Sequence, residues 1–201
     1  MVSKAKNVPV LNGLVLAGGK SLRMGKPKDK INWHGKEQRY YLADILAPFC
    51  DQVYISCRQD QAFDLDPNYE LLKDAFSDLG PLGGVLSAFK SKPNQAWLVV
   101  ACDMPFLDAD CFEFLIQSRN ADKIATAYQN PIDNLPEPLI TIWEPKSYPI
   151  LNDSCALGNT SLRKFLINND ALIIKPLKPE ILLNINTPEE MLKAAEILKN
   201  R

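Results

Sequence analysis

Residues 13–28 read Gly-Leu-Val-Leu-Ala-Gly-Gly-Lys-Ser-Leu-Arg-Met-Gly-Lys-Pro-Lys. The first five form a short apolar run, and such a run followed by paired glycines is typical of a buried strand that ends in a tight loop. Glycines let the loop backbone turn back and expose N–H groups to an anion. Cations crowd the same loop and the residues just after it: Lys20, Arg23, Lys26, Lys28 and Lys30. The stretch therefore predicts a phosphate-binding turn at the end of a strand.

The spacing of this loop separates it from two common phosphate-binding motifs. A P-loop needs G-x-x-x-x-G-K-[ST], but here five residues separate Gly19 from Gly25, and Pro27 follows Lys26. The dinucleotide motif G-x-G-x-x-G is also missing from the loop. A basic surface loop without a ligand is the alternative interpretation.

Apolar runs alternate with helix-like stretches along the rest of the chain. Strands are expected at 13–17, 52–56, 69–73, 96–102, 124–128, 139–143, 171–175 and 182–185. Helices are expected at 36–49, 81–90, 108–117, 145–156, 159–168 and from Thr187 onward, and a loop at 130–138. The alternation predicts an α/β fold with a mainly parallel sheet and helices on both faces. In such sheets, ligands bind outside the carboxyl ends of the strands.

Length and charge narrow the class of protein. The 201 residues predict a single domain over 1–201, with 1–9 as a flexible N-terminus. The formal net charge of −1 argues against a broadly basic nucleic-acid binder. We expect no membrane span, because no apolar run approaches the roughly 18 residues that one needs. The N-terminus has no signal-peptide pattern, so we expect a cytoplasmic protein.

Cysteine and histidine usage excludes several kinds of site. The five cysteines are scattered without a C-x-x-C pair, which argues against structural zinc and indicates reduced, mostly buried thiols. His34 is the only histidine, so no site can need two. A serine–histidine relay through His34 would lack the usual G-x-S-x-G elbow.

Two further strand ends carry polar residues. Asp103-Met-Pro-Phe106 follows the clearest buried strand, and an acid at that position is suited to hold Mg²⁺; a carboxylate that merely caps the turn is the alternative. Asp74 follows the third strand. The run Gly80-Pro-Leu-Gly-Gly84 allows a ligand to approach the backbone closely, or else packs tightly on the sheet. Cations for phosphates together with an acid for Mg²⁺ predict a nucleotide site for displacement at phosphorus.

These segments resemble a known family. Leu16-Ala-Gly-Gly-x-Ser-x-Arg-Met-Gly-x-Pro-Lys28 resembles the signature loop of nucleotidyltransferases with a Rossmann-like (GT-A-like) fold, and among these the molybdenum cofactor guanylyltransferases, the MobA family, are most similar. Four more segments match: Asp74 with Gly80-Pro-Leu-Gly-Gly84, Asp103-Met-Pro-Phe106, Pro138-Leu139, and Asn184-Ile-Asn-Thr-Pro-Glu189. The resemblance spans residues 12–195, and the loop, D-M-P and N-x-N-T-P-E in this order are specific.

The resemblance implies roles for the nucleotide side of the site. The backbone that would cradle the nucleotide belongs to Leu16, Ala17, Gly18 and Gly19. Lys28 matches the family lysine that contacts the triphosphate, with Lys30 as its rival, and Arg23 would help to neutralise the leaving pyrophosphate. Asp74 would contact the base or the ribose. Two residues at the end of the second strand lie where the family reads the base: Ser56 and Arg58.

It also implies roles for the metal and the acceptor. Asp103 would bind Mg²⁺, and Asn184 and Asn186 would face the pterin or the metal. Arg163, in a basic stretch seen in some members, is a further candidate to hold the pterin phosphate. Pro27 departs from the family, since many members have Asp or Val there, and the region 145–170 is the least similar.

The resemblance implies a reaction. The terminal phosphate of molybdenum-loaded molybdopterin would attack the α-phosphorus of GTP, release pyrophosphate and form the guanine dinucleotide cofactor. A molybdenum-insertion protein is a plausible source of so labile an acceptor. The alternatives are a molybdopterin cytidylyltransferase, which tends to read L-A-A-G rather than L-A-G-G; a sugar-1-phosphate nucleotidyltransferase, which is usually longer; and a nucleotide-binding regulator without turnover.

Overall fold

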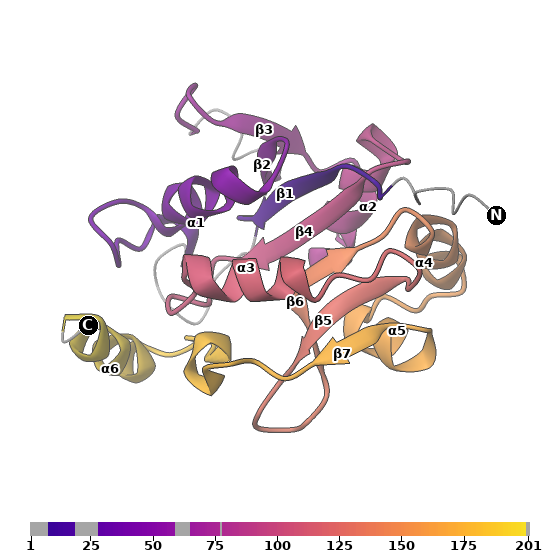
Figure 1. The fold of residues 1–201 in the computed structure, drawn as a ribbon. Helices are drawn as coiled ribbons and strands as arrows, with labels where there is room; N and C mark the ends of the chain where they lie inside the picture. Colours follow the sequence, from indigo (N-terminus) through magenta and orange to yellow (C-terminus); the bar gives the residue numbers. More distant parts are fainter. Residues whose placement is uncertain (1–7, 19–27, 59–64, 77, 200–201) are drawn as a thin grey trace.

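The computed structural model describes residues 8–18, 28–58, 65–76 and 78–199, so residues 1–7 of the expected flexible N-terminus lie outside the described residues. The described chain forms a sheet in the order β3-β2-β1-β4-β6-β5-β7 (Figure 1). Its strands are β1 (Leu11–Leu16), β2 (Val53–Cys57), β3 (Glu70–Lys73), β4 (Ala96–Ala101), β5 (Ala125–Gln129), β6 (Pro136–Trp143) and β7 (Leu172–Ile174). Only β6 runs antiparallel to its neighbours among these described strands, which confirms the mainly parallel sheet.

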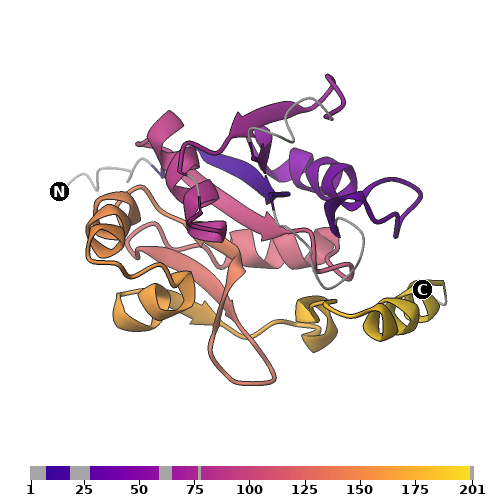
Figure 2. The same cartoon turned by 180° about the vertical axis from the view of Figure 1, so that it is seen from behind.

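Helices cover both faces of the sheet, as expected. They are α1 (Gln38–Leu46), α2 (Pro81–Ser91), α3 (Ala109–Gln117), α4 (Ser147–Ala156), α5 (Leu162–Asn168) and α6 (Pro188–Lys199). α1 and α3 pack on one face, where Leu42 and Phe112 enter the core. α2, α4 and α5 pack on the other face, seen in Figure 2, around Phe89, Trp97 and Trp143. Within the described residues, no helix is both long and apolar enough to span a membrane.

The strand register sets the site residues at one level of the sheet. Leu72 pairs with Ser56, Ser56 with Leu16, and Leu16 with Ala101. Each of these four strands carries a polar or glycine residue two positions farther on: Asp74, Arg58, Gly18 and Asp103. Since side chains two apart point to the same face of a strand, this row brings the predicted site residues to one edge.

The expected loop at 130–138 ends earlier than predicted. β6 already begins at Pro136, so the loop prediction is wrong for 136–138. Prolines are tolerated here because they lie at the start of the strand: the last pair between β6 and β4 is Val100 with Ile140. The pairing of β6 with β5 also shifts register between Ala127 and Tyr128. Two prolines therefore enter the strand without breaking its ladder to β4.

The expected strand at 182–185 is also wrong. Its place is taken by a 3₁₀ turn, η4 (Pro179–Leu182), followed by an extended segment without a strand partner among the described residues. Leu182 is buried in the same core cluster as Phe112 of α3, and Ile185 is buried against Phe106, which accounts for two apolar residues of the run. The backbone N–H of Ile185 then donates to the carbonyl oxygen of Asp103 at 2.8 Å. The segment therefore binds the loop that follows β4 and does not add a strand to the sheet.

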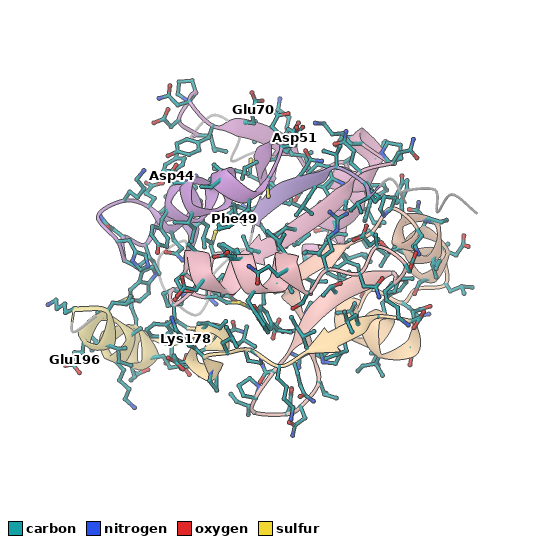
Figure 3. All side chains as sticks on the ribbon, viewed as in Figure 1. Asp44, Phe49, Asp51, Glu70, Lys178 and Glu196 are labelled. Atoms are coloured by element: carbon teal, nitrogen blue, oxygen red, sulfur yellow. The ribbon has the colours of Figure 1, made fainter. Side chains whose placement is uncertain are left out.

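The C-terminal helix lies beside the carboxyl ends of the central strands. Figure 1 shows α6 on the side toward which the arrows of β1 and β4 point. Its inner face packs Ala194 against Phe106 and Ile185, with Trp33 at the edge of the cluster. Figure 3 shows Glu196 on the outer side of this helix. α6 therefore covers the segment that follows the predicted phosphate loop.

The helix α2 begins with closely packed glycines. Gly80 has φ +56° just before the helix, a backbone conformation that favours glycine. Gly83 lies so close to the preceding turn that an added Cβ would stand 2.7 Å from the carbonyl oxygen of Phe76. At Gly84, the added Cβ would stand 2.6 Å from Cδ2 of Leu16. The run brings the backbone of α2 against the end of β1.

We predict that Gly83→Ala lowers the free energy of unfolding by about 1 kcal/mol or more, measured by urea unfolding. Alanine in place of a helical glycine usually stabilises by up to about 1 kcal/mol, so the contact with the Phe76 carbonyl must outweigh this gain. Gly84→Ala is the matched control, because its Cβ meets the movable end of a side chain and should cost less. Unchanged or higher stability of Gly83→Ala would contradict the close packing.

Candidate active site

One corner of the site lies where β1, β2 and β3 end. Arg58 donates through Nη1 to the carbonyl oxygen of Gly18 at 2.7 Å, so it holds the last described residue before the phosphate loop. Ser56 donates through Oγ to Oδ1 of Asp74 at 2.5 Å. An added Cβ on Gly18 would stand 3.4 Å from Oδ2 of Asp74, and one on Gly84 would stand 3.0 Å from Oγ of Ser56. We call these five residues the nucleoside corner.

Asp74 is the acidic residue of the nucleoside corner, and its surroundings change the pKa of its carboxyl. Burial raises the pKa of its carboxyl, and the hydrogen bond from Ser56 and the charge of Arg58 oppose that rise. Oδ1 is bonded to Ser56, while Oδ2 faces Gly18. A half-buried carboxylate oxygen beside bare glycine backbone is suited to accept a hydroxyl or amide proton from a ligand in that space.

A second corner joins three segments that are far apart in the sequence. Lys28 Nζ donates to Oδ1 of Asn186 at 2.7 Å and lies 3.5 Å from Oδ2 of Asp103. The side chains of Lys28 and Asp103 are 20% and 21% exposed, so the pair is reachable from solvent but partly sheltered. Lys30, the rival lysine, is exposed. We call Lys28, Asp103, Asn184 and Asn186 the phosphate corner.

The lysine is held in place by the residue after it. Asp29, in the short turn η1 (Lys28–Lys30), is 3% exposed and pairs with Arg39 of α1, with Oδ2 at 3.4 Å from Nη1. Arg39 also pairs with Glu37, with Nη2 at 2.7 Å from Oε2. Burial raises the pKa of Asp29, and the charge of Arg39 opposes that rise. A buried ion pair is costly to break, so η1 is anchored on α1.

The loop after β4 is held at successive carbonyl groups. Gln38 Nε2 donates to the Met104 oxygen at 3.3 Å, and Tyr41 donates through its hydroxyl to the Leu107 oxygen at 3.5 Å. His34 Nε2 lies 2.9 Å from the Pro105 oxygen, an acceptor that requires a proton on this nitrogen. His34 also stacks on Tyr41. The only histidine therefore has a structural partner in the loop that presents Asp103.

The phosphate corner has oxygen atoms suited to a divalent cation. Oδ1 of Asp103 and Oδ1 of Asn184 are buried and lack a hydrogen-bond partner. Among the described residues, no three His, Cys, Asp or Glu side chains come together as a metal-binding group. Carboxylate and amide oxygens fit Mg²⁺, which is commonly bound by one or two carboxylates plus substrate phosphates rather than by an all-protein cage. The residues present therefore fit a magnesium ion shared with a nucleotide.

A third group lies at the start of β6. Glu137 is 2% exposed and receives Arg163 Nη2 at 3.0 Å, while Nη1 of Arg163 donates to Oδ2 of Asp133 at 2.8 Å. Burial raises the pKa of Glu137; the charge of Arg163 opposes the rise, and the nearby charge of Asp103 adds to it. The Arg163 side chain is 33% exposed. The group therefore presents one partly exposed guanidinium that two carboxylates hold in place.

The structure brings most of the predicted residues together. It places Leu16 at the end of β1 and Ala17 just after it, where the Ala17 N–H donates to the Ser56 oxygen at 2.9 Å. The other predicted residues within the described chain fall in the two corners: Gly18, Lys28, Asp74, Asp103, Asn184 and Asn186. Gly19 and Arg23 lie outside the described residues.

Sequence reasoning missed the residues that support the site. Glu137 stands between Pro136 and Pro138, in a stretch that the sequence predicted to be a loop. Asp29 lies between Lys28 and Lys30, and nothing in this basic run indicates that its side chain is buried. The contacts of Gln38 and His34 join segments about 70 residues apart in the chain, which no local pattern could reveal.

A comparison with known protein families finds one family that matches most of this chain. Residues 13–172 match the family described as the MobA-like NTP transferase domain. The matched segment contains most of β1, the Asp74 strand end and the Asp103 loop, but stops before Asn184.

Individual proteins that are similar to this chain in sequence or in structure have names that agree with this family. The chain is 37% identical over 182 residues to a molybdenum cofactor biosynthesis bifunctional protein of Synechocystis, covering 90% of this chain and 52% of that protein, so it spans about half of that relative. It is 30% identical over 192 residues to a molybdenum cofactor guanylyltransferase of Pseudomonas entomophila, covering 92% of this chain and 98% of the relative. The fold is similar, with a TM-score of 0.78 and 24% identity, to molybdopterin-guanine dinucleotide biosynthesis protein A from Archaeoglobus fulgidus, covering 94% and 100% of the two chains.

The raised pKa of Asp74 predicts a pH-dependent stability. A carboxyl whose pKa is higher in the folded than in the unfolded chain contributes stability below its ordinary pKa and loses it as the pH rises through the folded value. Asn at this position stays neutral and keeps an oxygen for Ser56. We therefore expect Asp74→Asn to melt above the wild type near about pH 7.5, with the difference shrinking toward about pH 4. A lower melting temperature than the wild type at the higher pH would contradict this.

Proposed function

This chain belongs to the MobA-like NTP transferase family and is a nucleotidyltransferase, and on that premise we propose that it transfers GMP from GTP to the terminal phosphate of molybdenum-loaded molybdopterin. Pyrophosphate is the other product. The observation that carries the proposal is the phosphate corner, where a lysine, a carboxylate and two amide groups from distant segments meet at the carboxyl edge of the sheet.

The nucleoside corner gives the nucleotide its orientation. In our proposal, the backbone of Leu16, Ala17, Gly18 and Gly19 runs along the nucleotide, because a chain without large side chains allows close approach. Asp74 accepts a hydrogen bond from the ribose or the base. Ser56 and Arg58 support this acceptor and the Gly18 carbonyl, as their bonds in the structure indicate.

The phosphate corner neutralises the triphosphate. Lys28 binds the phosphates as a compact positive charge, and Arg23 helps to neutralise the departing pyrophosphate. Asp103, with Asn184 or Asn186 beside it, holds Mg²⁺. When bound there, the ion supplies a positive charge to the phosphate oxygens and fixes their orientation. The free oxygens of Asp103 and Asn184 support this assignment.

The transfer is a displacement at the α-phosphorus. An oxygen of the terminal phosphate of molybdopterin forms the new bond to this phosphorus, and the bond to the bridging oxygen of the β-phosphate breaks. The electron pair of that bond leaves with pyrophosphate. The acceptor phosphate is already ionised, so the site needs to position and neutralise charge more than it needs a strong base. This agrees with a site whose only histidine holds a backbone carbonyl.

The acceptor side is proposed from Arg163. Its guanidinium is fixed by Glu137 and Asp133 and is partly exposed, so it is a candidate to hold the pterin phosphate. We expect delivery of this acceptor by a molybdenum-insertion protein.

We also propose the cytoplasm as the compartment, because all five cysteines lie among the described residues and are free thiols, as in reducing compartments.

Nucleotide preference is tested by thermal shift with GTP, CTP, ATP and UTP, each with and without Mg²⁺. A ligand at about 100 times its dissociation constant stabilises by about 2.7 kcal/mol, and this raises the melting temperature of a chain of this size by several degrees. We expect the largest shift with GTP and Mg²⁺. A larger shift with CTP favours a cytidylyltransferase, one with UTP favours a sugar-1-phosphate enzyme, and no shift with any nucleotide would contradict the site.

The role of Asp103 is tested by Asp103→Asn. Removing one charge that holds the cation is expected to lower turnover on the order of 10²–10³-fold while the protein stays folded. Asp110→Asn is the matched control, because Asp110 follows in the same region and its side chain is 74% exposed. Pyrophosphate release measures turnover, and a melting curve checks the fold. Wild-type turnover of Asp103→Asn would remove the carboxylate from the mechanism. A variant that fails to fold would assign Asp103 a structural role instead.

A further inference from the structure

The first turn of α6 is connected to the phosphate corner by hydrogen bonds. Glu190 N–H donates to Oγ1 of Thr187 at 3.2 Å, and Thr187 N–H donates to Oε2 of Glu190 at 3.1 Å. This reciprocal pair is a capping box, which satisfies the free N–H groups at the start of a helix. The same Oε2 also accepts the N–H of Asn186 at 2.7 Å. That third bond goes beyond what a capping box needs.

Asn186 leads from the cap to the lysine. Its backbone is held by Glu190, and its side-chain Oδ1 accepts a hydrogen bond from Lys28 Nζ at 2.7 Å. Lys28 Nζ in turn lies 3.5 Å from Oδ2 of Asp103. The connection therefore runs from Glu190 through Asn186 to the charged pair of the phosphate corner.

We propose that Glu190 is a positioning residue, which fixes Asn186 so that its amide oxygen aims the Lys28 ammonium at the triphosphate beside Asp103. The proposal rests on the proposed function and adds a residue to it that touches neither nucleotide nor metal. Glu190 acts through the backbone N–H of Asn186, and its carboxylate serves as a hydrogen-bond acceptor.

The neighbouring residues explain why Asn186 needs this support. Ile185 is anchored on one side, with its side chain 7% exposed and its N–H bonded to the Asp103 oxygen at 2.8 Å. Asn186 itself is exposed, so packing does not fix it. The bond from Asn186 to Glu190 therefore fixes the other end of the same peptide segment.

The flexibility of lysine makes such support useful. A free lysine side chain has up to about 2 kcal/mol of rotamer entropy to lose when it is ordered. Groups that act on a reacting phosphate must be held close to their working geometry, since small displacements cost rate. Glu190 and Asn186 order the lysine before the nucleotide binds.

The chain offers a control that separates positioning from helix capping. Thr187→Ala removes the acceptor for the Glu190 N–H and weakens the capping box, but it leaves the carboxylate of Glu190 able to accept from Asn186. Glu190→Gln keeps an acceptor oxygen at the same distance along the side chain and removes only the charge. Glu196→Ala removes an exposed acid from the outer side of the same helix and serves as a surface control.

The experiment measures pyrophosphate release with GTP and molybdopterin for each variant. Glu190→Ala is expected to lower kcat/KM for GTP by about tenfold, within the range for residues that orient groups bound to a metal or substrate. KM for the acceptor should stay within about twofold, since Glu190 lies on the nucleotide side of the reaction. Glu190→Gln should recover most of the loss. Thr187→Ala should lower the melting temperature as Glu190→Ala does, yet keep kcat/KM near the wild-type value.

A double-mutant cycle with Asn186→Ala tests the connection itself. If Glu190 acts through Asn186, the double variant is no slower than Asn186→Ala alone. Additive losses, or a Thr187→Ala variant as slow as Glu190→Ala, would reduce Glu190 to a helix cap and overturn the proposal. A wild type that uses CTP in place of GTP overturns the proposed function only, because the cycle is then measured with CTP. A wild type that uses no nucleotide overturns both.

Discussion

The contact between the Lys28 ammonium and the Asp103 carboxylate is the constraint on which this molecule depends. The two residues are 75 positions apart, and a parallel sheet is what brings their segments together. β4 is fully buried along its length, so its end is a rigid support for Asp103. Lys28 has no strand beneath it, and instead relies on the buried pair of Asp29 with Arg39 and on Asn186. A positive and a negative group held 3.5 Å apart suit the phosphates and the cation that we propose for this site.

The contacts that support the site are of one kind, in which a side chain or a backbone N–H of one segment binds a backbone carbonyl of another. Gln38, His34 and Tyr41 hold the loop from Met104 to Leu107, and the N–H of Ile185 holds the Asp103 carbonyl. Backbone acceptors are present at every residue, and here their bonds add to the packing of Met104, Phe106 and Leu107, whose side chains are buried. The bonds that hold this loop therefore go to its backbone carbonyl groups and leave the carboxylate of Asp103 available for the proposed chemistry. The C-terminal segment takes part in these contacts although it lies outside the sheet.

The sequence predicted the sheet and the main charged residues because both depend on local patterns. Apolar runs such as Ala96–Ala101 must be buried strands, and acids at their carboxyl ends must meet at one edge. The sequence did not separate Lys28 from Lys30, since both lie in the same basic run; the structure adds that Lys28 pairs with Asp103. The run at 182–185 has the composition of a strand, but Leu182 and Ile185 pack into two separate apolar clusters and the backbone N–H of Ile185 binds the Asp103 oxygen. The sequence predicted acids in the first turn of the last helix, but not the bond of Glu190 to Asn186, and it did not predict the pairing of Glu137 with Arg163, because both contacts reach outside the local segment.

The most direct test of the account follows the phosphorus atoms of the nucleotide. The enzyme is incubated with Mg²⁺, molybdenum-loaded molybdopterin and GTP labelled with ³²P at the α-phosphate in one sample and at the γ-phosphate in another. The account predicts that the α label moves to the pterin product and that the γ label leaves as pyrophosphate, with both events lost when the acceptor is omitted. An α label that stays with free nucleotide, or a γ label released as orthophosphate, would contradict displacement at the α-phosphorus and with it the central claim.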